Sequence, residues 1–114
     1  MAADPERKRP GLPAVTEADL LAAVIELALL RGWAVHHCRP ARTSKGWRTP
    51  IKGTPGFVDL VLARDGRLLF VELKSARGKL SAGQEEWIKA LRLHGDLVFV
   101  WQPADWDEIE RTLM

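Results

Sequence analysis

The chain of 114 residues contains a single cysteine, Cys38, and no apolar run near the roughly 20 residues that a membrane-spanning helix needs. One cysteine excludes an internal disulfide and is typical of a reducing compartment, so we expect a cytoplasmic protein that is not bound to membranes. The first residues also lack the apolar stretch of a secretory signal. Their proline and charge content predicts a flexible arm over residues 1–14, and residues 15–114 are expected to form a single domain.

Several common signatures of chemistry are missing as well. The sequence has no glycine-rich phosphate loop, no paired-cysteine zinc spacing and no Ser/His/Asp arrangement. His36 and His37 are adjacent in a predicted strand, so their side chains point to opposite faces and would not chelate one ion together. Candidate functional residues are therefore sought among the carboxylates and the basic residues.

The pattern of apolar residues predicts an α/β fold in the order αβββαβ, followed by a short C-terminal helix. Thr16 and Ser81 each begin a helix with the spacing of a capping box, because Asp19 and Gln84 follow three residues later. The expected elements are a helix from Thr16 to about Leu30, strands over 33–39, 57–63 and 68–73, a helix from 81 to 95, a buried strand over 97–101 and a final helix over 104–113.

A tight hairpin is predicted between the second and third strands, because Asp65-Gly66 lies between two apolar runs. If these two residues are the centre of the turn, the register places Asp59 directly opposite Glu72. Side chains alternate along a strand, so Glu72 and Lys74 share one face. Two carboxylates and one ammonium group are therefore expected to meet on one patch of the sheet.

Two carboxylates in such a position repel each other. Directly opposed residues have Cβ atoms about 5 Å apart, and the repulsion at an effective dielectric constant of about 20 is on the order of 3 kcal/mol. Lys74, a raised pKa of one carboxyl group or a bound divalent cation would offset it. One interpretation is thus a site of carboxylate oxygens for Mg²⁺ or Mn²⁺. The alternatives are a structural ion cluster, or a slipped register that separates the two acids.

A third acid lies on the first predicted helix. At about 100° per residue, Glu17 falls on the same side as the apolar residues Leu20 and Val24. We therefore expect Glu17 to point inward and to reach the carboxylate patch. The alternative is an acid of the first helical turn that interacts only with the helix dipole.

Positive charge is concentrated in the segment 39–52, which contains no acidic residue. We expect this segment to be a long loop that contacts nucleic acid, because cations bind phosphates and an aromatic ring stacks on bases. The alternative is a solvated loop without a ligand. The candidate nucleic-acid-binding residues are Arg39, Arg42, Lys45, Trp47, Arg48 and Lys52.

Three short motifs together resemble the VRR-NUC domain family, a branch of the PD-(D/E)xK nuclease superfamily. The motifs are Gly-Phe-Val-Asp at 56–59, Phe-Val-Glu-Leu-Lys at 70–74 and Leu-Ser-x-x-Gln at 80–84. The resemblance covers about residues 16–101 and implies a restriction-endonuclease-like fold. It also implies that Glu17 is the acid of the first helix and that Gln84 supports the site. Val58 departs from the pattern, since such proteins often have proline before the aspartate, and this affects how the strand begins.

The resemblance implies a metal-dependent nuclease that hydrolyses DNA, with structure-selective substrates and a bacterial or phage context. The implied catalytic residues are Glu17, Asp59, Glu72, Lys74 and Gln84. Asp59, Glu72, the backbone carbonyl of Leu73 and Glu17 would hold Mg²⁺ or Mn²⁺. Lys74 would act as a base or stabilise charge. A Holliday-junction resolvase, a non-catalytic nucleic-acid-binding module and a protein-interaction scaffold stay open as alternatives, as does a homodimer or higher homo-oligomer.

Overall fold

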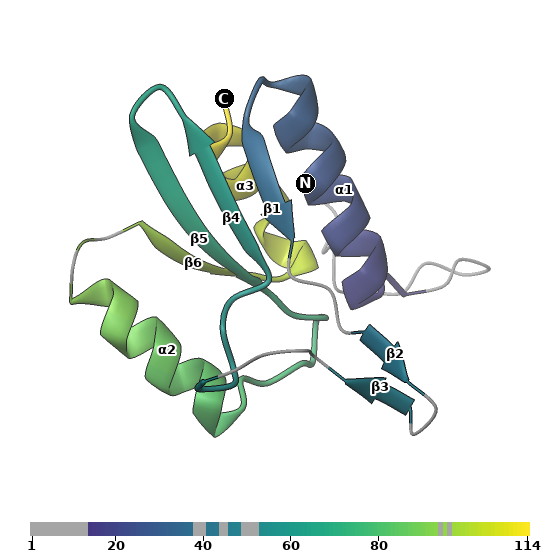
Figure 1. The fold of residues 1–114 in the computed structure, drawn as a ribbon. Helices are drawn as coiled ribbons and strands as arrows, with labels where there is room; N and C mark the ends of the chain where they lie inside the picture. Colours follow the sequence, from purple (N-terminus) through teal and green to yellow (C-terminus); the bar gives the residue numbers. More distant parts are fainter. Residues whose placement is uncertain (1–13, 38–40, 44–45, 49–52, 94, 96) are drawn as a thin grey trace.

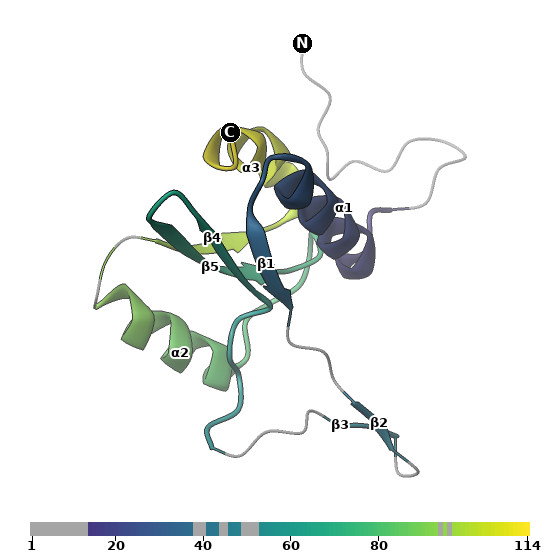
Figure 2. The same cartoon turned by 45° about the horizontal axis from the view of Figure 1, so that its top comes forward.

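The computed structural model describes residues 14–37, 41–43, 46–48, 53–93, 95 and 97–114. A mixed sheet of four strands forms the centre of the described part, with helices on both faces (Figure 1). Seen after a rotation, α1 and α3 lie on one side of the sheet and α2 lies on the other (Figure 2). Within the described segments, no helix combines the length and apolar character that crossing a bilayer requires.

The sheet has the order β1-β4-β5-β6 and comprises β1 (Ala34–His37), β4 (Leu60–Arg64), β5 (Arg67–Leu73) and β6 (Val98–Trp101). The first three strands are antiparallel to their neighbours, whereas β5 and β6 are parallel. A parallel pair needs a crossover connection, and α2 (Ala82–Arg92) provides it. Arg64 pairs with Arg67, which confirms the predicted hairpin register.

The helix α1 (Glu17–Leu30) begins at the predicted capping box. Thr16 Oγ1 accepts a hydrogen bond from the backbone N–H of Asp19, and Asp19 Oδ2 accepts one from the N–H of Thr16. Its buried residues Leu20, Val24 and Ala28 recur at four-residue spacing and face the sheet. The N-terminal end of α1 is thereby fixed next to the sheet.

Each face of the sheet has its own apolar core. The larger core joins α1, α3 and the alternate β5 residues Leu69, Val71 and Leu73. The smaller core lies beneath α2 and contains Ile88 and Val98, with Phe70 packed against them. Glu72 lies on the α2 face with Phe70, because successive side chains of β5 alternate between the two faces.

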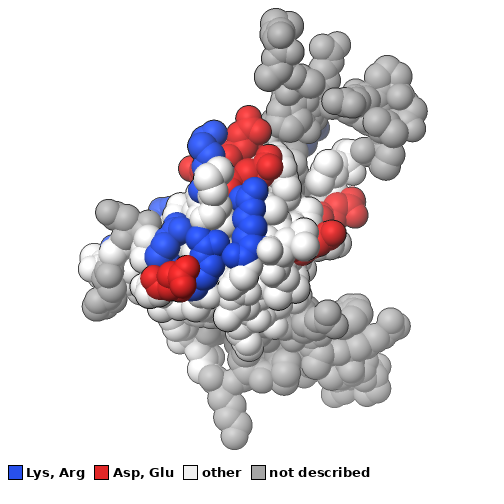
Figure 3. All heavy atoms as spheres, turned by 90° about the horizontal axis from the view of Figure 1, so that it is seen from above, with Lys and Arg blue, Asp and Glu red and all other residues white. Residues whose placement is uncertain are grey.

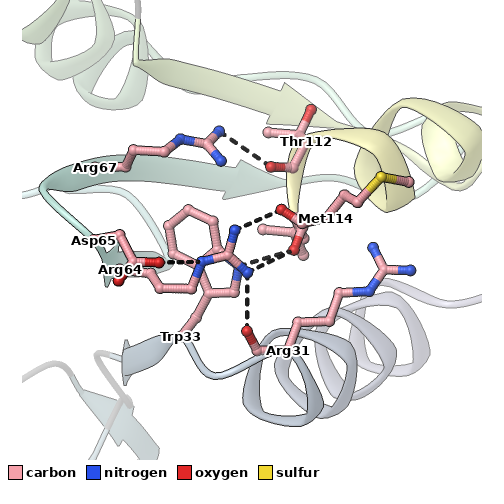
Figure 4. A network of polar contacts seen from close by, with 8 residues as sticks. Arg31, Trp33, Arg64, Asp65, Arg67, Thr112 and Met114 are labelled. Atoms are coloured by element: carbon pink, nitrogen blue, oxygen red, sulfur yellow. Dashed lines mark hydrogen bonds and ion pairs between the residues drawn. The ribbon is translucent and has the colours of Figure 1, made fainter.

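The C-terminal helix α3 (Trp106–Thr112) follows a 3₁₀ turn, η1 (Pro103–Asp105), and is held to the hairpin by arginines (Figure 4). Arg64 Nη2 donates to the carbonyl oxygen of Met114, which follows α3, and Arg67 Nη2 donates to that of Thr112 at 3.1 Å. Both guanidinium groups lie over the ring of Trp33, at 4.6 and 5.0 Å from its centroid. These cations favour the carbonyl end of a helix, so they stabilise the docking of α3.

Viewed from above, at the end of the hairpin, Lys and Arg side chains lie beside Asp and Glu side chains (Figure 3). Arg64 forms an ion pair with Asp65 there, with 3.5 Å between Nε and Oδ2. The arginines of this end are thus engaged with helix carbonyls and with acids. We assign them to the stability of the fold.

One expectation was wrong within the basic segment. Residues 41–43 and 46–48 form a separate two-stranded sheet, β2 (Ala41–Thr43) and β3 (Gly46–Arg48), where a continuous loop was expected. The two strands are short and have no alternation of apolar and polar residues, so the pattern carried little strand signal. In Figure 1 this small sheet lies beyond the end of the main sheet that is opposite to the β4–β5 turn.

Candidate active site

Asp59 lies immediately before the first residue of β4. The paired register begins with Leu60 opposite Val71, so Asp59 precedes the ladder in a bend while keeping the predicted position next to Glu72. Its Oδ2 accepts a hydrogen bond of 2.8 Å from the backbone N–H of Leu73. This bond replaces a ladder contact and fixes the Asp59 carboxylate against the end of β5.

Glu72 is fully buried, with no exposed surface. Burial and the neighbouring carboxylate of Asp59 raise the pKa of Glu72 from 4.5 to about 8, whereas Lys74 lowers it. Glu72 Oε2 is buried without a hydrogen-bond partner. Because two ionised carboxylates only accept hydrogen bonds, Asp59 and Glu72 need a shared proton or a cation between them.

Gln84 and Lys74 contact the other oxygen of Glu72. Gln84 Nε2 donates to Glu72 Oε1 at 3.2 Å, while Gln84 Oε1 accepts from the N–H of Ser81 in the capping box of α2. Lys74 Nζ lies 3.8 Å from the same Glu72 oxygen, and 13 % of the Lys74 side chain is exposed. The cap of α2 therefore orients Glu72, and Lys74 presents a positive charge at the surface of the site.

Two glycines bring the entry of β4 against the first turn of α2. Gly56 has φ +99°, and a Cβ atom placed on it would lie 2.5 Å from the backbone carbon of Gly83. A Cβ on Gly83 would in turn meet the carbonyl oxygen of Pro55 at 3.2 Å. This close backbone approach holds Asp59 and Gln84 on either side of Glu72.

Glu17 differs from its expected position. Its side chain is exposed in the first turn of α1, where we expected it to point inward. The buried stripe of α1 begins only at Leu20, about one turn later. The charge of Glu17 nevertheless raises the pKa of Glu72, so the two carboxylates are electrostatically coupled. A role of Glu17 in the site therefore stays a prediction.

The residues at this site fit a hard divalent cation only in part. Within the described ranges, no group of three or more His, Cys, Asp or Glu side chains is arranged to hold a metal ion. Asp59 and Glu72 supply carboxylate oxygens, and Glu72 Oε2 has no hydrogen-bond partner that would compete with a cation. Mg²⁺ is commonly held by one or two carboxylates, together with water and substrate phosphates. Asp59 and Glu72 therefore provide the two carboxylates that such a Mg²⁺ site needs.

Sequence reasoning missed a second basic segment beside the site. Arg77 and Lys79 are exposed in the connection between β5 and α2. This connection is held by Gln102, whose Nε2 donates to the carbonyl oxygens of Ser75 and Ala76 at 3.2 Å each. The sequence could have indicated this segment, because residues 74–79, Lys-Ser-Ala-Arg-Gly-Lys, contain three basic residues and no acidic residue.

Half of the predicted nucleic-acid-binding residues lie outside what the structure describes. Arg39, Lys45 and Lys52 lie outside the described residues. Arg42 and Trp47 are backbone partners in the β2–β3 ladder, and Arg48 ends β3. Their predicted contact with nucleic acid therefore stays a prediction.

Comparison with known proteins gives one match. The family model described as "VRR-NUC domain" matches residues 24–105, a range that contains Asp59, Glu72, Lys74 and Gln84 but not Glu17. Neither the curated proteins nor the solved structures contain a significant match.

Proposed function

The chain belongs to the VRR-NUC domain family, which has a restriction-endonuclease-like fold and a nuclease-type function, and from this we propose that it is a metal-dependent nuclease that hydrolyses DNA. One observation carries the proposal: a fully buried glutamate with an unpartnered oxygen lies beside Asp59, Lys74 and Gln84. A buried carboxylate oxygen without a hydrogen-bond partner destabilises the fold. In a purely structural ion cluster we would expect that oxygen to have a partner.

Asp59 and Glu72, with the backbone carbonyl of Leu73, would hold Mg²⁺ or Mn²⁺, and Glu17 would join at the rim. When bound, the cation would neutralise charge on the phosphate and lower the pKa of an attacking water molecule. Gln84 keeps Glu72 in place through its hydrogen bond, and the N–H of Leu73 does the same for Asp59. Lys74 carries the positive charge that would stabilise the developing charge of the phosphate.

The substrate backbone would be held by basic residues around this site. Arg77 and Lys79 extend from the connection next to Lys74. The basic residues of 39–52 are proposed as a second set of phosphate contacts, because the segment rejoins the described chain at Gly53, next to Thr54, whose carbonyl oxygen accepts a hydrogen bond from Trp87 of α2. Cations on both sides of the carboxylates would offset the repulsion between the acids and the DNA phosphates.

The proposed activity is tested by incubating the purified protein with labelled single strands, duplexes, flaps and four-way junctions. We expect cleavage with Mg²⁺ or Mn²⁺ and no cleavage with a chelator. In Asp59→Asn the cleavage rate should fall by about 100-fold or more, because the variant loses a carboxylate needed to hold the cation. Asp107→Asn, an exposed acid on α3, is the matched control and should cleave like the wild type. Cleavage that persists in the chelator would contradict the proposal.

The same panel separates the alternatives. A Holliday-junction resolvase would cut the four-way junction symmetrically and would require a two-fold dimer. A non-catalytic module would bind the substrates without cutting any of them.

A further inference from the structure

Among the phenylalanines and tryptophans whose side-chain burial the structure describes, which leaves out Trp47, only Phe57 is exposed, with 38 % of its surface accessible. Exposing a large apolar ring to water has a cost of about 25 cal/mol per Å². Phe57 lies on the chain between the basic segment and Asp59, two residues before this candidate active-site carboxylate.

The exposed ring is held in one orientation. Phe57 packs edge to face with Trp87, at 5.0 Å between ring centroids and an interplanar angle of 84°. Phe70 contacts it in the same manner at 6.3 Å. Trp87 is itself fixed, since its Nε1 donates to the carbonyl oxygen of Thr54 at 3.1 Å. An aromatic side chain that is both rigid and exposed is suited to binding a flat ligand.

Each of the three aromatic residues is close in sequence to a residue of the candidate active site. Phe57 precedes Asp59 by two residues, and Phe70 precedes Glu72 by two residues on the same face of β5. Trp87 follows Gln84 by about one helical turn on α2. Two residues of extended chain span roughly 7 Å. A nucleotide bound at the carboxylates would therefore have its neighbouring base within reach of Phe57.

We propose that Phe57 is a stacking platform for one unpaired base of the substrate, adjacent to the phosphate that is cut. The inference rests on the proposed nuclease function and names its substrate class: DNA with an unpaired nucleotide, such as a single strand or a flap. A base inside a duplex already has both faces stacked. Only an unpaired base offers a free face to the ring, and any of the four bases will stack.

A purely structural role would give a different result. In that case Phe57 only covers the edge of the small core beneath α2, and leucine would replace it with little effect on binding. Phe57→Leu keeps the apolar cover but removes the aromatic face, whereas Phe57→Trp keeps both. Comparing the two substitutions therefore isolates stacking from packing.

The test measures binding of a fluorescently labelled single strand and of a matched duplex by anisotropy, with a chelator present so that no cleavage occurs. For Phe57→Leu we expect single-strand affinity to fall by about 5- to 100-fold, and the ratio of single-strand to duplex affinity to fall with it. Phe57→Trp should restore the ratio. Leu68→Ala, at an exposed apolar residue near the hairpin turn, is the control and should bind like the wild type.

Either an unchanged ratio in Phe57→Leu or a wild-type protein that does not bind single strands would overturn the stacking platform. Failure of the proposed nuclease function gives a separate result. In that case, addition of Mg²⁺ or Mn²⁺ to the wild type yields no cleavage, while the dependence of single-strand binding on Phe57 is still observed.

Discussion

Replacing Glu72 with glutamine is expected to abolish cleavage and, at the same time, to stabilise the folded chain. Cleavage should fall by at least about 10²–10³-fold, because the variant loses a carboxylate needed to hold the cation. The folded chain should become more stable because glutamine removes a buried charge. Its amide group can donate to Asp59 from the position of the unpartnered Oε2, and its oxygen can still accept from Gln84.

The gain in stability depends on pH with a defined sign. The pKa of Glu72 is 4.5 when unperturbed and about 8 in the fold, so between these values the folded chain keeps a proton that the unfolded chain has lost. The contribution of Glu72 to the free energy of unfolding is therefore fully present below about pH 4.5 and is lost as the pH rises to about 8. Glutamine does not titrate, so the variant should lose this dependence.

Urea unfolding of the metal-free protein at pH 5, 7 and 8.5 measures this effect. The free energy of unfolding of Glu72→Gln should exceed that of the wild type. The difference should grow with pH and reach about 2–4 kcal/mol at the highest pH. Glu86→Gln, at an exposed position of α2, is the matched control and should change little. A Glu72→Gln protein that is destabilised at every pH would instead indicate a structural ion cluster.

The second large effect is expected at Lys74. Changing Lys74 to methionine should lower cleavage by about 10²–10³-fold, since it removes the positive charge that we propose stabilises the phosphate. Lys74 also lowers the pKa of Glu72. Without it, Glu72 should keep its proton to higher pH, and the residual activity of the variant should rise to its maximum at higher pH than in wild type.

Cleavage rates between pH 6 and 10 measure this shift, with Lys89→Met on the exposed face of α2 as the control. A rate that falls without the upward shift would show that Lys74 does not control the protonation of Glu72. If Lys74→Met cleaves at the wild-type rate, Lys74 has no role in cleavage.

Much of the carboxylate pair could be predicted from the sequence, because local rules fix it. The Asp65-Gly66 turn sets the hairpin register, and the register sets which residues lie opposite each other. The capping box at Ser81 and Gln84 was equally local, and the structure confirms it. What the sequence did not reveal is that Gln84 also donates to Glu72, since that contact depends on how α2 packs against the sheet.

Other features depended on distant parts of the chain. Glu17 is exposed although it lies on the apolar side of α1, because helical periodicity gives the side on which a residue lies but not whether another element covers it. The close approach of Gly56 to Gly83 joins residues far apart in sequence, and so does the contact of Phe57 with Trp87. The exposed aromatic ring beside the carboxylates therefore became visible only in three dimensions.

The central claim is that Asp59 and Glu72 hold a divalent cation, and calorimetric titration of the protein with Mn²⁺ tests it most directly. We predict one Mn²⁺ per chain in the wild type, with affinity that increases as the pH rises towards about 8, because the cation displaces the proton of Glu72. Binding should be lost in Glu72→Gln and retained in Glu86→Gln. Equal Mn²⁺ affinity in Glu72→Gln and wild type would contradict the account.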